Sequence, residues 1–285
     1  MRYFITGNKG QLGSALIERV TTNSADHPDF DVTNYAETRA AIDKSNADIV
    51  LHCAAFTDVE GCAENPAMAY QINGLGTQNV ALACADAGLA MALISTNEVF
   101  DGTKTTHYWE FDQRQPINSY GQSKYAGERY VETLLNKFYI IRTSWLYASG
   151  GKNFVHRILQ LADERGELDV VADELGMPTR TTDLAQGIVD LVSTNRYGVY
   201  HLVNSGRHDE MPSRWDFAKH ALEASGRTNF PLNKIKLSDY KRLSTPPANG
   251  VLANTAAKSL GIELPNWQEA LEEFLAVDSK STTGK

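Results

Sequence analysis

The chain has 285 residues and a formal net charge of −8, with 42% hydrophobic and 22% charged residues. Its length predicts about two domains, or one core with a smaller lobe. The acidic balance argues against nucleic acid or an anionic membrane as the main partner. No apolar run approaches the ~20 residues of a transmembrane helix, and the first residues lack a signal-peptide pattern. We therefore expect a cytoplasmic protein without a membrane partner.

The cysteines and histidines give no sign of a disulfide framework or a metal site. The three cysteines, Cys53, Cys62 and Cys84, form no CxxC pair, which predicts reduced thiols. The seven histidines show no spacing typical of metal ligands. We expect no catalytic metal, while a Mg²⁺ ion at a subunit contact stays open.

Short β-rich runs alternate with segments of helical periodicity in the first 200 residues. Strands are expected to cover or end in 4–6, 49–51, 91–94, 138–141, 168–171 and 199–202, and helices 11–20, 35–44, 67–86 and 119–135. This alternation is typical of a parallel sheet with helices on both faces. The predicted fold class is therefore α/β, a Rossmann-like doubly wound sheet to which all six strands belong.

The alternation stops after about residue 203, where further helices are expected at 213–224 and 267–275. We predict a dinucleotide-binding domain of residues 1–145 plus about 167–203. A smaller C-terminal substrate-binding lobe would comprise about 146–166 plus 204–277. The polar residues 278–285 are predicted to form a disordered tail.

A glycine-rich loop occupies the first strand–helix junction. Gly7, Gly10 and Gly13 have the spacing GxxGxxG. Gly7 permits a tight exit from the strand, Gly10 lets backbone approach a pyrophosphate, and Gly13 allows close helix packing. The loop predicts dinucleotide binding.

The cofactor preference cannot be assigned from the next segment. No strand pattern precedes Asp31, which we expect to reach the adenine edge. The residue that would distinguish a ribose 2′-hydroxyl from a 2′-phosphate cannot be placed. NADPH and NADH both stay open.

A tyrosine and a lysine one helical turn apart are the first catalytic candidates. Tyr120 and Lys124 lie at positions i and i+4 of an expected helix, so they share one face. An ammonium near a phenol stabilises the phenolate and lowers the phenol's pKa. Thr96 follows a buried strand, at the sheet edge where ligands bind in this architecture, and its hydroxyl can contact a carbonyl oxygen.

These features resemble the extended short-chain dehydrogenase/reductases, and most closely the dTDP-4-dehydrorhamnose reductase family, over about residues 2–275. Beyond the loop and YxxxK, the matching segments are His52 to Thr57, Arg142 to Tyr147, Asn153-Phe154, Asp173 to Thr179, Tyr200 to Leu202 and Leu264 to Trp267. The segments at Arg142 and Asp173 are more specific than a glycine loop.

The resemblance implies reduction of a nucleotide-linked 4-keto-6-deoxy sugar by NADPH or NADH. It implies that Tyr120 protonates the alkoxide at C4, Lys124 tunes Tyr120 and holds the nicotinamide ribose, and Thr96 orients the carbonyl oxygen. The implied cofactor contacts are Gly7, Lys9, Gly10, Gln11, Leu12, Asp31, Val32, Cys53, Ala54, Ala55, Tyr120 and Lys124. The implied substrate contacts are Thr57, Val59, Trp145 and Asn153, to which we add Glu98.

Several of these residues have other interpretations. Trp145 could fill a core gap, and Asn153 could cap a helix. Arg207 and Arg214 could offset the diphosphate charge or lie on a solvated surface.

The chain departs from the family pattern at three places. Asn97-Glu98 replaces the family's Asp-Tyr, so a carboxylate stands where an aromatic ring borders the nicotinamide and sugar. Pro246 stands where an Arg-Pro pair often begins, which removes a possible phosphate contact. The third departure is the second strand, whose pattern is abbreviated in the segment before Asp31.

Two other functions stay open at this point. A related nucleotide-sugar epimerase or dehydratase is one, although Glu98 lacks the carboxylate partner that dehydratases use. A non-catalytic NADP-binding regulatory subunit is the other. The exact sugar and a homodimer also stay open.

Overall fold

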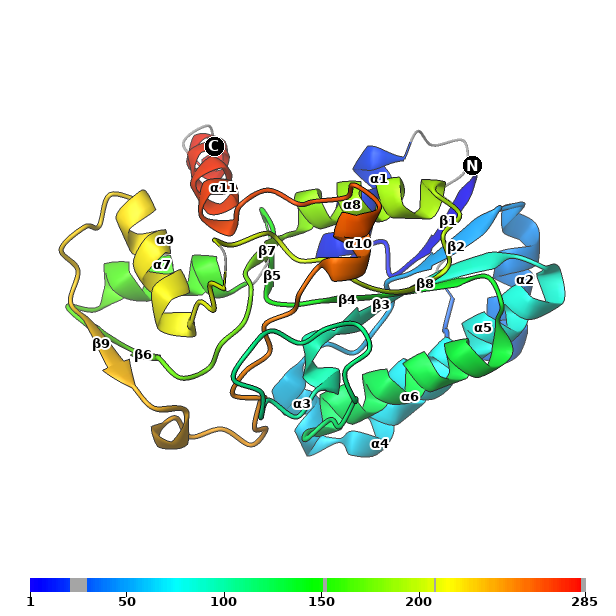
Figure 1. The fold of residues 1–285 in the computed structure, drawn as a ribbon, viewed down its shortest axis with the longest axis horizontal. Coiled ribbons are helices and arrows are strands. Elements are labelled where there is room, and N and C mark those ends of the chain that lie inside the picture. Colours follow the sequence, from blue (N-terminus) through cyan, green and yellow to red (C-terminus); the bar gives the residue numbers. More distant parts are fainter. Residues whose placement is uncertain (21–29, 151–152, 208, 283–285) are drawn as a thin grey trace.

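The computed structural model describes residues 1–20, 30–150, 153–207 and 209–282. Five parallel strands form its central sheet in the order β1-β2-β3-β4-β8 (Figure 1). They are β1 (Tyr3–Thr6), β2 (Ile49–His52), β3 (Ala90–Thr96), β4 (Phe138–Thr143) and β8 (Gly198–His201). The predicted α/β, Rossmann-like class is confirmed.

Helices cover both faces of this sheet (Figure 1), because successive strand side chains point to opposite faces. Ile5 packs in one apolar cluster with α1 (Gln11–Arg19), α8 (Thr181–Ser193) and α10 (Thr255–Ser259). Its neighbour Phe4 packs in another with α2 (Tyr35–Ser45), α5 (Gly76–Ala87) and α6 (Ser119–Leu134). The sheet is thus the middle of three layers.

Between β2 and α5 lie the short helices α3 (Val59–Glu64) and α4 (Pro66–Ala69) and the π-helical turn η1 (Tyr70–Leu75). The 3₁₀ turn η2 (Asn97–Val99) follows β3. The single helix expected at 67–86 is therefore α4, η1 and α5 in succession. None of the helices in the described part of the chain is long and apolar enough to cross a membrane.

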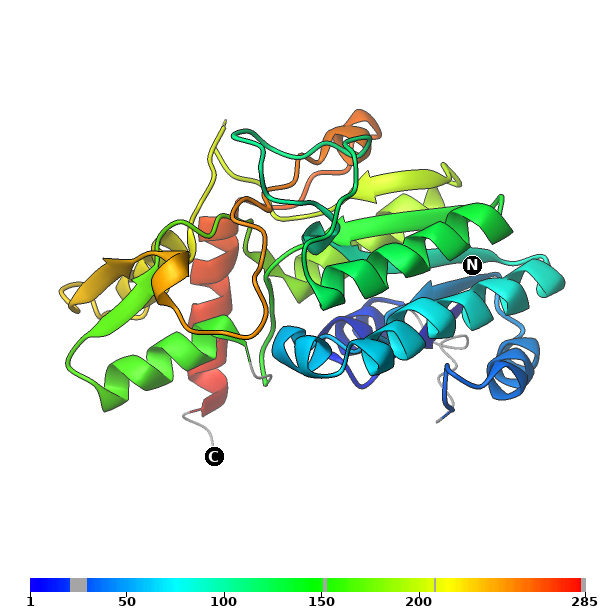
Figure 2. The same ribbon diagram turned by 90° about the horizontal axis from the view of Figure 1, so that it is seen from below.

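A smaller lobe lies beside the carboxyl ends of the strands (Figure 2). It contains α7 (Phe154–Glu164), β6 (Leu168–Val171), α9 (Arg214–Ala224), β9 (Leu232–Ile235), η3 (Leu237–Asp239) and α11 (Trp267–Thr282). The two-residue strands β5 (Leu146–Tyr147) and β7 (Thr179–Arg180) pair between the sheet and this lobe. The exact domain boundaries stay a prediction.

Two sequence expectations are wrong here. β6 does not join the central sheet but pairs with β9, because Leu168 and Val170 pack against the apolar faces of α7 and α9. The tail is not disordered over 278–282, because α11 continues to Thr282 and Asp278 accepts a hydrogen bond from His156 Nε2 at 2.9 Å. The expected gap in the strand pattern falls mainly on residues 21–29, outside the described residues.

Candidate active site

A cavity of about 890 Å³ lies at the carboxyl ends of the strands, between the sheet and α9. Its lining includes most of the residues that the sequence singles out. These are Gly7, Gly10, Gln11, Leu12, Cys53, Ala54, Ala55, Thr57, Val59, Thr96, Glu98, Tyr120, Lys124 and Trp145. Segments that are far apart in the chain thus meet at one site.

The glycine loop is shaped by close backbone contacts. Gly7 has φ +69°, and a Cβ there would lie 2.6 Å from Ala54 N. A Cβ on Gly13 would lie 2.3 Å from the Gly7 carbonyl oxygen. The turn closes through Gly10 N–H, which donates to Gly7 O at 3.0 Å, and α1 begins without a side-chain cap. This cradle at a helix N-terminus fits the pyrophosphate of a dinucleotide.

Thr96, Tyr120 and Lys124 line the cavity because β3 ends there and α6 begins there. Thr96 is the last residue of β3, and Tyr120 hydrogen-bonds with its side chain. Asn118 caps α6 by accepting a hydrogen bond from Gly121 N–H at 2.8 Å. A Cβ on Gly121 would lie 2.1 Å from Glu98 O, so glycine lets α6 begin directly against the end of β3.

The pKa of Tyr120 is raised rather than lowered. Burial and the nearby Glu98 carboxyl raise it, and they outweigh the hydrogen bond with Thr96. The expected lowering by Lys124 therefore does not dominate in the free protein. A phenol in this environment stays protonated at neutral pH, which is the form that donates a proton.

Lys124 is 3% exposed, and burial lowers the pKa of its ammonium to about 8. The Glu128 carboxylate acts in the opposite direction and raises it. Lys124 is therefore charged at neutral pH and loses its charge as the pH rises through about 8.

Glu98 lines the cavity, and Asn118 holds its carboxyl group. Its Oε2 accepts a hydrogen bond from Asn118 Nδ2 at 2.6 Å, and the same Nδ2 donates to Thr245 O at 3.0 Å. Burial raises the pKa of Glu98, and Glu174 adds to this effect. The Arg214 and Arg242 guanidiniums act in the opposite direction and lower the pKa of Glu98.

Trp145 and Arg214 also line the cavity. Trp145 has φ +45°, an uncommon conformation for a residue with a side chain. The Arg214 guanidinium lies 3.7 Å from the centre of a Trp145 ring and its Nε donates to Glu174 Oε1 at 3.0 Å. A cation stacked on an aromatic ring at the cavity wall suits an anionic ligand.

Four predicted contacts lie outside the cavity lining. Lys9 and Asp31 are exposed, and Asp31 Oδ1 accepts a hydrogen bond from Thr33 N–H at 2.8 Å. Val32 is buried in the core beside α5. Asn153 caps α7, accepting from His156 N–H and donating to Ala148 O at 2.7 Å. Their proposed ligand contacts stay predictions.

Sequence reasoning missed part of the lining. Phe56, Ile72, Asn97, Ser144 and Leu146 also border the cavity, and most of them adjoin residues that the motifs singled out. Arg214 comes from the lobe, where no motif distinguished it from a surface arginine. Arg207 lies elsewhere, exposed near Glu210.

The described residues contain no group of three His, Cys, Asp or Glu side chains that could hold a metal ion. The three cysteines are free thiols. Burial raises the pKa of the Cys53 thiol, which borders the cavity, to about 12. A thiolate nucleophile at this site is therefore disfavoured.

The family model described as "RmlD substrate binding domain" matches residues 1–279. The chain belongs to this family. It is 36% identical over 279 residues to the spore coat polysaccharide biosynthesis protein SpsK of Bacillus subtilis, covering 96% of each chain. A dTDP-4-dehydrorhamnose reductase of Sinorhizobium fredii is 34% identical over 292 residues, covering 96% of this chain and 97% of that one.

A solved relative has the same fold. The dTDP-4-dehydrorhamnose reductase of Bacillus anthracis, solved in complex with NADP, superposes with a TM-score of 0.90 and 36% identity. The match covers 96% of this chain and 98% of that one. The family resemblance predicted from the sequence is therefore confirmed.

Proposed function

We propose that this chain reduces the C4 ketone of a nucleotide-linked 4-keto-6-deoxy sugar with NADPH or NADH, and that the sugar is dTDP-4-dehydro-L-rhamnose. The observation that carries this proposal is the meeting of Thr96, Tyr120 and Lys124 in one cavity with the glycine loop. The names of the Sinorhizobium and Bacillus anthracis relatives support the reaction and the nucleotide sugar.

A bound nicotinamide supplies the hydride that reduces the ketone carbon. Tyr120 donates its phenolic proton to the carbonyl oxygen, so that the product is an alcohol. Thr96 orients that oxygen through its hydroxyl. The Lys124 ammonium donates hydrogen bonds to ribose hydroxyls and stabilises the phenolate left on Tyr120. Gly7 and Gly10 provide the backbone cradle for the pyrophosphate.

The substrate side of the cavity supports a sugar diphosphate. Arg214 offers positive charge to the diphosphate, and its guanidinium is held at the cavity lining by stacking on Trp145. Thr57 and Val59 border the same space. The Glu98 carboxyl accepts hydrogen bonds from sugar hydroxyls in place of the aromatic ring that the family pattern has there.

Glu98→Gln is expected to raise the KM for the keto sugar by up to about tenfold, since the net contribution of a side-chain hydrogen bond is about 0.5–1.5 kcal/mol. The Kd for NADPH should stay near its wild-type value. Glu64→Gln, at an exposed position at the end of α3 and outside the cavity lining, is the matched control. Steady-state kinetics with each variant give the result, and an unchanged KM in Glu98→Gln would remove Glu98 from the substrate site.

Deuterium transfer distinguishes the proposal from the other two functions. The keto sugar is incubated with NADPH that carries deuterium at C4 of the nicotinamide, and the two stereoisomers of this NADPH are tested in turn. One of them should transfer its deuterium to C4 of the sugar. An epimerase or dehydratase would instead yield an altered sugar without net cofactor oxidation. A regulatory subunit would bind NADPH without any sugar product.

A cytoplasmic location and a homodimer complete the proposal. Both rest on the sequence expectations, and gel filtration with light scattering tests the homodimer.

A further inference from the structure

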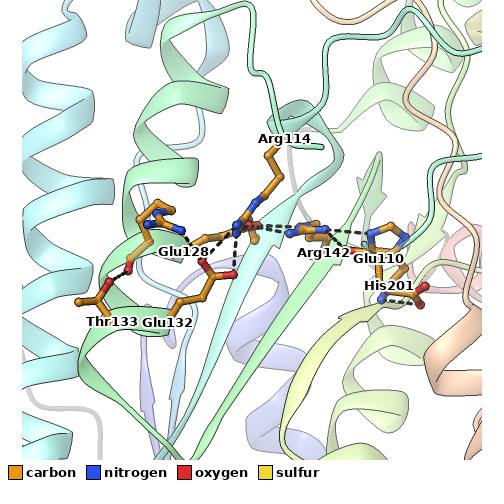
Figure 3. Close-up of polar contacts among 9 residues, drawn as sticks. Glu110, Arg114, Glu128, Glu132, Thr133, Arg142 and His201 are labelled. Carbon is orange, nitrogen blue, oxygen red and sulfur yellow. Dashed lines mark hydrogen bonds and ion pairs between the residues drawn. The ribbon is translucent and has the colours of Figure 1, made fainter. Parts of the chain in front are cut away.

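A cluster of opposite charges, with Glu128 and Arg142 buried at its centre, joins α6, β4 and the segment before α6 (Figure 3). We call Glu128, Arg142, Arg114 and Glu132 the Glu128 cluster. The Glu128 side chain is 0% exposed, and its two oxygens accept from Arg142 Nε at 2.9 Å and Arg142 Nη2 at 2.8 Å. Arg114 Nη1 bridges Glu128 Oε2 at 3.0 Å and Glu132 Oε1 at 2.8 Å.

Glu128 also connects this cluster to the end of β3. Ser95 Oγ donates to Glu128 Oε1 at 2.6 Å, and Ser95 immediately precedes Thr96. Ser95 and Arg142 are register partners on β3 and β4, while Glu128 belongs to α6. One carboxylate thus fixes α6 against the two strands whose ends form the floor of the active site.

The spacing along α6 places Glu128 in line with the catalytic residues. Tyr120, Lys124 and Glu128 follow one another at intervals of four residues, so they share one face of the helix. A shift of α6 along β3 would move Tyr120 and Lys124 together relative to Thr96.

The charge of Glu128 matters for Lys124 because the His52 and Cys53 side chains, which also interact with Lys124, are uncharged. Burial lowers the pKa of His52 to about 3, so His52 is neutral, and the Cys53 thiol is protonated. Among the described groups that interact with Lys124, Glu128 is the carboxylate that opposes the loss of its charge. Tyr120, one turn away, stays neutral.

A gain in fold stability alone is a weak explanation for this arrangement. Desolvation offsets most of the attraction in a buried ion pair, and apolar replacements of similar volume are often no less stable. A role in setting the position and charge of a catalytic lysine is a better explanation for burying these charges.

We propose that Glu128 is a positioning residue of the active site, which holds Tyr120 and Lys124 in register with Thr96 and keeps Lys124 charged. The proposal rests on the proposed function for its kinetic consequences, while its effect on Lys124 exists in the free protein. Glu128 acts through these residues and does not touch substrate.

Two substitutions separate the effect of the Glu128 charge from the effect of its side-chain length. Glu128→Gln keeps the length of the side chain and removes the charge, whereas Glu128→Asp keeps the charge and withdraws it by one methylene. Glu132→Gln is the control, because Glu132 binds the same Arg114 but lies one turn farther from Lys124 and is partly exposed. Thermal unfolding reports the stability of each variant.

The charge effect is measured in the free protein by NMR titration of ¹³C-labelled lysine, with Lys124→Met assigning the signal. We expect the Lys124 midpoint to move to lower pH in Glu128→Gln and to stay near the wild-type value in Glu128→Asp and Glu132→Gln. The alkaline loss of kcat/KM should move in parallel. This readout is independent of turnover, so failure of the proposed function does not obscure it.

The geometric effect is measured as kcat. Glu128→Asp should lose about tenfold to a hundredfold, because small misplacements of catalytic groups have effects of this size. An unmoved Lys124 midpoint in folded Glu128→Gln, or an equal shift in Glu132→Gln, would overturn the charge role. If Glu128→Gln does not fold, wild-type kcat in Glu128→Asp overturns the positioning role, and a reduced kcat with an unchanged midpoint supports it.

Discussion

Tyr120→Phe is expected to lower turnover of the keto sugar about 10²–10⁴-fold, the usual contribution of general acid catalysis. Only the phenolic hydroxyl is lost, and the ring still fills the space beside Thr96. Because we propose that the glycine loop and Lys124 hold the cofactor, the Kd for NADPH should change little. Steady-state kinetics and fluorescence titration with NADPH measure the two effects separately.

The matched control is Tyr130→Phe on the same helix. The Tyr130 hydroxyl lies 2.7 Å from the Tyr70 hydroxyl, and Tyr130 does not line the cavity. Its loss should leave kcat near the wild-type value. Comparable activity in Tyr120→Phe and the wild type would exclude Tyr120 as the proton donor.

Lys124→Ala is expected to impair both cofactor binding and rate. Loss of charged hydrogen bonds to the ribose, worth about 1.5–3 kcal/mol, should weaken NADPH binding about tenfold to a hundredfold. Turnover should fall further, because the phenolate that forms on Tyr120 loses its stabilising ammonium. Lys137→Ala, an exposed lysine just beyond α6, is the control and should behave as the wild type.

The pH dependence gives this prediction a specific signature. The pKa of Lys124 is lowered to about 8, so the charged form, which we propose binds the ribose, is present below this pH and lost above it. NADPH binding by the wild type should therefore weaken as the pH rises through about 8. Lys124→Ala should lack this dependence, and an unchanged NADPH Kd in Lys124→Ala would contradict the ribose contact.

The central fold could be predicted because it depends on local patterns. Short apolar strands alternate with helices, and residues such as Phe4 and Ile5 must bury on opposite faces of the sheet. The place of β6 could not be predicted in the same way. Leu168 and Val170 suit any buried sheet face, and only the tertiary contact with α7 and α9 directs β6 to β9.

The site was predictable where a motif has a fixed place in the fold. The glycine loop and the ends of β2 and β3 necessarily converge at one edge of a parallel sheet, which brings Gly7, Ala54 and Thr96 together. The role of Asn153 could not be predicted from the sequence, because an asparagine before a helix serves equally well as a cap or as a ligand contact. The role of Arg214 could not be predicted either, since its stacking on Trp145 joins segments 69 positions apart.

The position of Glu128 in the sequence also carries a signal. It continues the four-residue spacing of Tyr120 and Lys124 by one more turn, into a helix face that an isolated charge would avoid. The arginines that make its burial possible come from β4 and from the segment before α6. Their approach to one carboxylate depends on the fold and not on local sequence.

The most direct test of the account is nicotinamide absorbance during incubation with dTDP-4-dehydro-L-rhamnose, with NADPH and NADH supplied separately. We expect substrate-dependent oxidation of the reduced cofactor, abolished in Tyr120→Phe, and the ratio of the two rates gives the cofactor preference. Oxidation of neither cofactor with this sugar or a panel of related keto sugars, by protein that binds NADPH in titration, would contradict the reductase assignment and favour a non-catalytic cofactor-binding subunit.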